Sequence, residues 1–132
     1  MKRTNTNTKA FKAMVQKFIV NSFDNLDSFK QTFKNCKTYN KTKYQAACYM
    51  VEGGCFDCYY NDVAQTMADW FDCTSDNIWQ YFEDDSEKLW SAYIHIIAIN
   101  IVNIIDNLKY FKFNLSNTLI IVVMLKFSKN VI

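Results

Sequence analysis

The chain has 132 residues, which is enough for one domain with a core and too few for two. Half of its residues are apolar and it contains no proline, which excludes disordered, collagen-like and proline-rich chains. Only Gly53 and Gly54 are available for a glycine-rich loop, so the nucleotide-binding motifs built on such loops are excluded too. We expect one globular domain over residues 9–132, preceded by a flexible polar tail at 1–8.

Apolar residues recur at helical spacing through most of the chain. Asn21 or Ser22 is expected to cap the second helix, Asn61 or Asp62 to begin the fourth, and Ser75 to cap the fifth. The third helix is expected to end at Gly53 in the left-handed conformation. The predicted helices cover about residues 11–19, 22–33, 40–51, 61–72, 75–82 and 86–108.

The last and longest of these helices follows a cap at Asp85 or Ser86 and is apolar nearly all round. Its regular stripe comprises Trp90, Ile94, Ile97, Ile101, Ile104 and Leu108. A strand is the rival interpretation of this segment, but the length of the apolar run favours a helix. A helix of this kind belongs in the centre of a domain. The sequence therefore predicts a mainly α fold, a compact bundle of about five or six helices around residues 86–108.

The C-terminal stretch has a different pattern. Phe111, Phe113 and Leu115 alternate with polar residues, and Leu119–Leu125 is a continuous apolar run. This pattern predicts a β-hairpin within residues 109–127, with a final helix as the alternative. Leu119–Leu125 is far shorter than the roughly 20 residues that cross a bilayer, and no signal peptide is evident. We expect a cytoplasmic protein.

The small net charge hides a strong segregation along the chain. Residues 1–44 contain ten bases and two acids, residues 45–90 contain ten acids and one base, and the remainder has a net charge of +3. One interpretation is that the two blocks neutralise each other across the folded surface. Another is that the acidic block presents a surface to a basic partner. A third is that the basic block, Lys9–Lys43, binds nucleic acid, although arginine is the better reader of guanine and phosphate.

Five cysteines lie within the middle of the chain, and an odd number argues against a disulfide framework. Cys55 and Cys58 form a CxxC pair after two glycines, a spacing that allows both thiolates to reach one zinc ion. A helix over residues 40–51 places Cys48 near this pair, so a structural zinc stapling the turn at 53–58 is predicted, with Cys48, Cys55, Cys58 and His95 as ligands.

Alternatives to this ligand set remain. Cys48 also fits as a buried cysteine and His95 as a core histidine, in which case Cys36 or Cys73 replaces the imidazole. A catalytic zinc also needs an open position and a general base, and no sequence motif supplies them. We therefore expect no enzymatic activity.

The chain resembles small anti-CRISPR proteins of phages and mobile elements, specifically metal-containing inhibitors of the type II RNA-guided nuclease. The resemblance rests on size, on the Cys55–Cys58 pair and on the acidic, aromatic segment from Glu52 to Glu87. It implies a bacterial host and a partner with a basic nucleic-acid channel, which an acidic surface blocks. Trp70 is a candidate anchor, while Phe82 and Trp90 are expected in the core. The residues predicted to bind the partner are Asp57, Asp62, Asp69, Asp72, Asp76, Trp79, Tyr81, Glu83, Asp84, Asp85 and Glu87.

Overall fold

Six α-helices follow one another along the part of the chain that the computed structural model describes, which is residue 6 and residues 8–108. The mainly α fold and the number of helices in this part are confirmed. The hairpin predicted within residues 109–127 lies outside the described residues. The helices are α1 (Lys9–Asn21), α2 (Leu26–Thr38), α3 (Lys43–Glu52), α4 (Tyr60–Phe71), α5 (Ser75–Tyr81) and α6 (Ser86–Asn107).

Polar side chains begin five of the six helices by accepting a hydrogen bond from a backbone N–H of the first turn. The prediction for α6 is confirmed, because Asp85 accepts from the N–H groups of Glu87 and Lys88. The predicted caps of α2 and α5 are wrong. The remaining caps are Thr8 for α1, Asn25 for α2, Thr42 for α3 and Thr74 for α5.

The later start of α2 has a local cause. Asn25 accepts from the Ser28 N–H at 2.8 Å, and the Ser28 hydroxyl accepts from the Asn25 N–H, so the two residues form a capping box. The fourth helix begins slightly before the predicted residues, at Tyr60, and Tyr59 supplies no side-chain cap. Short polar side chains thus indicated that a helix begins nearby. The exact first residue depended on which of these side chains formed a hydrogen bond with the residue three positions later.

The left-handed glycine at the end of α3 is one residue later than predicted. Gly53 has a φ of −78°, while Gly54 has a φ of +86°. The Gly54 N–H bonds to the Val51 carbonyl and the Cys55 N–H to the Met50 carbonyl, which is the Schellman arrangement. This arrangement requires the left-handed residue one position beyond the cap, where glycine carries no steric penalty.

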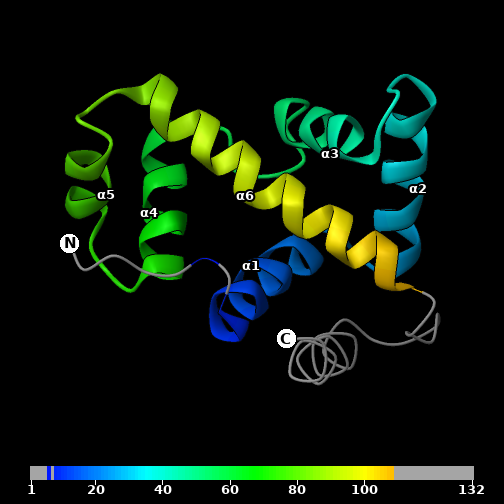
Figure 1. Ribbon diagram of the computed structural model, residues 1–132, viewed down its shortest axis with the longest axis horizontal. Helices are drawn as coiled ribbons and strands as arrows, with labels where there is room; N and C mark the ends of the chain where they lie inside the picture. Colours follow the sequence, from blue (N-terminus) through cyan, green and yellow to red (C-terminus); the bar gives the residue numbers. More distant parts are fainter. Residues whose placement is uncertain (1–5, 7, 109–132) are drawn as a thin grey trace.

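Helix α6 runs diagonally through the molecule and packs against α1, α3 and α4 (Figure 1). Its central position, predicted from its composition, is confirmed. The buried stripe differs at the start of the helix, where Trp90 and Ile94 are only half-buried. The buried apolar residues of α6 are Leu89, Tyr93, Ile97, Ala98, Ile101 and Ile104.

An aromatic stack explains this shift of the stripe. The ring of Tyr93 lies nearly parallel to that of Trp70 on α4, with centroids 5.9 Å apart, and its second neighbour is Trp90 at 5.6 Å. Trp70 is therefore a core residue, and its assignment as a partner anchor is wrong. The contact of these three rings joins α4 to the first half of α6.

Helix α6 is also long and apolar enough to cross a bilayer, and it is the one such helix among the described residues. The central helix of a globular core has the same length and composition, so this property does not distinguish the two environments. In the structure its buried apolar residues pack against the other helices, chiefly α1, α3 and α4.

A pair of matched substitutions tests the orientation of α6. Ile97 is fully buried, whereas Ile99 is 43% exposed on the same helix. Ile97→Ala should lower the free energy of unfolding by about 2–5 kcal/mol because it leaves a cavity. Ile99→Ala should change it by about 0.5 kcal/mol or less. Urea denaturation of both variants measures the difference, and equal losses would contradict the described orientation.

Candidate functional site

Seven exposed carboxylates gather on α4 and its C-cap, on α5, on the loop between α5 and α6 and in the first turn of α6, and we call this region the acidic end. Asp57 and Asp85, also predicted to bind a partner, are half-buried and have local roles. Asp57 accepts a hydrogen bond from the Thr66 hydroxyl, and Asp85 caps α6. The acidic end comprises Asp62, Asp69, Asp72, Asp76, Glu83, Asp84 and Glu87.

The carboxylates of α4 share one face because of their spacing. Asp62 and Asp69 are two helical turns apart and both are exposed, and the exposed Asp72 follows as the left-handed cap of the helix. The opposite face carries Val63 and Met67, which are fully buried. Burial of the apolar face therefore turns the acidic face outward.

The loop between α5 and α6 presents two more carboxylates from an unusual backbone conformation. Glu83 and Asp84 have φ values of 57° and 56°, in the left-handed region that residues other than glycine seldom adopt. The Asp84 N–H bonds to the Trp79 carbonyl at 2.8 Å, which closes the end of α5. Both side chains are exposed, and Lys88 approaches Glu83 at 3.4 Å.

The charge segregation seen along the chain is kept in space. Helices α4 and α5 lie toward one end of α6, and α2 lies toward the other (Figure 1). We call the lysines of α2 and of the turn after it, Lys30, Lys34, Lys37 and Lys41, the basic end. Lys43 forms an ion pair with Asp106 at 2.6 Å, and Lys88 forms one with Glu83. Neither ion pair joins a lysine of the basic end to a carboxylate of the acidic end.

The first helix is the border between the two regions. Its residue Lys17 lines the same shallow surface groove as Asp69 of α4. A positive charge therefore borders this side of α4, while the residues that line this groove include no carboxylate of α5 or of the following loop.

Exposed tyrosines accompany the acidic end, and sequence reasoning missed two of them. Tyr81 was predicted and is 54% exposed, while Trp79 is half-buried. Tyr59 and Tyr60 are 74% and 48% exposed at the start of α4, where Tyr60 meets Trp90 edge-on with centroids 6.4 Å apart. Tyr59 and Tyr60 directly precede the first carboxylate of α4 in the sequence, and this position could have indicated that they belong to the same surface.

The four residues predicted to bind zinc have different neighbours in the structure. Cys48 hydrogen bonds with Tyr44, whose hydroxyl also forms a 2.9 Å hydrogen bond with Nδ1 of His95. Cys48 and His95 are therefore brought to one phenol. The other two residues belong to the turn after α3, where Cys58 is exposed.

In the remaining half of the predicted zinc site, Cys55 has Cys36 as a neighbour. Cys55 is half-buried, and Cys36 lies near enough to contribute electrostatically to its raised pKa, although the sequence predicted Cys36 only as an alternative ligand. Among residues 6 and 8–108, no three side chains of His, Cys, Asp or Glu lie close enough to share a metal ion. The zinc site stays a prediction.

Burial controls the chemistry of most of the thiols. It raises the pKa of Cys36, Cys48, Cys55 and Cys73, because a charged thiolate is poorly solvated in a half-buried position. These thiols are accordingly protonated at neutral pH and are weak nucleophiles in the absence of a metal ion.

No family model, curated protein or solved structure matches this chain. Its function has to be inferred from its own residues.

The different exposures of the thiols predict an order of modification. In chelator-treated protein at pH 7, maleimide should label exposed Cys58 first. Labelling of the other four should be slower and should accelerate as the pH rises toward their raised pKa values, since the thiolate is the reactive form. Peptide mass spectrometry at successive times measures the order. Labelling of Cys55 ahead of Cys58 would contradict the described turn.

Proposed function

We propose that this chain is a non-enzymatic inhibitor that places its acidic end in the nucleic-acid channel of a basic protein. The observation that carries the proposal is the gathering of exposed carboxylates at one end of the fold, on α4, α5, the loop after α5 and the first turn of α6. A channel that holds phosphates attracts such a surface over long distances and is then closed to its own ligand.

The scaffold supports this role in two ways. The carboxylates of α4 are held by a helix whose other face is packed in the core, so little conformational freedom is lost when a partner binds. Tyr59, Tyr60 and Tyr81 lie beside them and are exposed. Tyrosine contributes a large contact area at interfaces, and these rings are candidate anchors between the charges.

The partner class that we propose is the type II RNA-guided nuclease of a bacterial host. This nuclease holds the duplex of guide RNA and target strand in a positively charged channel. It recognises the duplex through the sugar-phosphate backbone. The negative charge of the acidic end suits such a channel. The sequence resemblance to anti-CRISPR proteins supports the same partner.

A second candidate function is nucleic-acid binding through the basic end. The observation that favours it is the exposure of Lys34 and Lys41 on the side of the fold away from α5. Binding of this kind depends on phosphate contacts and weakens steeply with salt. It also predicts binding to bare DNA or RNA, which the inhibitor function does not.

Neutralising the acidic end tests the main proposal. The variant Asp62→Asn/Asp69→Asn/Asp72→Asn/Asp76→Asn keeps the shape of each side chain, and asparagine tolerates the left-handed conformation of Asp72. Its affinity for a catalytically inactive type II nuclease, measured by interferometry with and without guide RNA, should fall by about tenfold or more. The parent chain should also compete with target DNA.

The matched control neutralises four charges at the other end, Lys30→Gln/Lys34→Gln/Lys37→Gln/Lys41→Gln. This control should bind the nuclease with nearly the parent's affinity. Equal losses in both variants, or no binding by the parent, would overturn the proposed partner surface. Tight, salt-sensitive binding of the parent to bare DNA that only the lysine variant loses would establish the second function instead.

The predicted structural zinc has its own test. If the thiols gather around a metal ion, protein purified without chelator should contain about one zinc per chain, and Cys55→Ser should lower the free energy of unfolding by several kcal/mol. Elemental analysis and thermal unfolding measure both effects. Less than about half an equivalent of zinc together with an unchanged melting temperature would make the cysteines ordinary core residues.

A further inference from the structure

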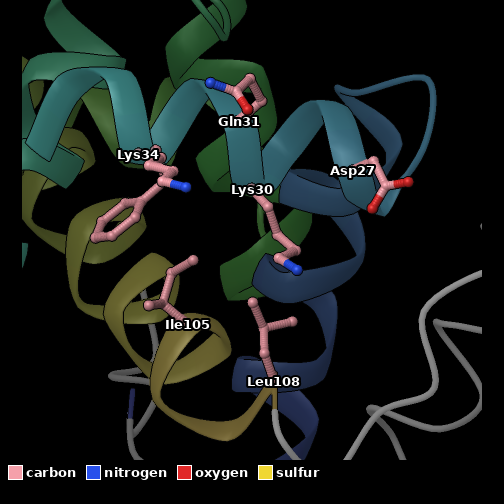
Figure 2. A pocket seen from close by; sticks show the side chains of 7 residues that line it. Asp27, Lys30, Gln31, Lys34, Ile105 and Leu108 are labelled. Carbon is pink, nitrogen blue, oxygen red and sulfur yellow. The ribbon is translucent and has the colours of Figure 1, made fainter.

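A shallow groove separates α2 from the last turn of α6 at the basic end of the molecule (Figure 2). It has a volume of about 400 Å³ and is open to the surface. In Figure 2, Ile105 and Leu108 project from α6 toward α2, and Lys30 extends from α2 into the space between the helices. The lining residues are Asp27, Lys30, Gln31, Phe33, Lys34, Ile105 and Leu108.

The chemistry of the groove suits apolar side chains. Phe33 and Leu108 form a nearly buried floor, at 7% and 8% exposure, and Ile105 is half-buried beside them. The long stems of the lysines add apolar walls, because such side chains keep their charged ends in water while their methylene groups cover apolar surface. A ligand for this groove is therefore a short row of apolar side chains.

The chain itself continues from the groove with residues of this kind. Leu108 lines the groove, so the segment that follows it starts there. In that segment Phe111, Phe113 and Leu115 alternate with Lys112 and Asn114. Side chains at alternate positions of an extended stretch point to the same side, which gives one apolar and one polar side.

We propose that residues 109–115 occupy this groove in the same molecule, with Phe111, Phe113 and Leu115 toward Phe33 and Ile105. Lys112 and Asn114 then face water. Because the segment is attached beside the groove, its effective concentration there greatly exceeds that of a separate chain. This docking is independent of the proposed function, and it covers part of the basic end while leaving the acidic end free.

A photocrosslinker in the full-length chain tests this occupancy. Gln31 is exposed at the rim of the groove, so replacing it with p-benzoylphenylalanine leaves the core intact. Irradiation should give crosslinks within the monomer that peptide mass spectrometry assigns to residues 109–115. The same crosslinker at Gln65, exposed on α4, should give no crosslink to this segment.

Two sets of substitutions distinguish a specific dock from chance contact. Phe111→Ser/Phe113→Ser/Leu115→Ser should reduce the intramolecular crosslink by about tenfold or more, because the apolar side of the segment is lost. Lys112→Ser/Asn114→Ser, which changes only the polar side, should keep it. Crosslinked dimers, crosslinks to residues 119–125, equal yields from both sets, or no crosslink at position 31 would each overturn the proposal.

Discussion

The burial of α6 is the constraint on which the rest of the structure depends. A helix that is apolar nearly all round has to be covered on several sides, and α1, α3 and α4 provide that cover. The stack of Trp70 on Tyr93 fastens α4 to the first half of α6, and the fully buried Ile97, Ile101 and Met50 lie in the same core. The other helices take their positions from these contacts.

The acidic end is a consequence of that packing. Once Val63 and Met67 of α4 are buried, the 3.6-residue period directs Asp62 and Asp69 to the solvent. The short α5 follows α4 closely, and the left-handed residues Glu83 and Asp84 reverse the chain into α6. Carboxylates from α4, α5, the following loop and the first turn of α6 thus share one end of the molecule, away from α2.

The thiols show how far spacing alone can predict a site. Gly53 and Gly54 correctly indicated a tight turn before the Cys55–Cys58 pair, and the Schellman end of α3 forms it. The neighbours of each thiol depend instead on how α2 and α6 pack on α3. That packing brings Cys36 toward Cys55, and it brings His95 to Tyr44, one turn before Cys48.

The sequence by itself determined the helical fold, the central role of α6 and the separation of charge, because apolar periodicity and charge blocks are local properties of the chain. Only the tertiary structure decided the status of individual residues. Trp70 is buried because α4 stacks on α6, and Tyr59 and Tyr60 are exposed because α4 begins at the surface. Such contacts join residues that are distant in sequence, and the periodicity of the sequence contains no information on them.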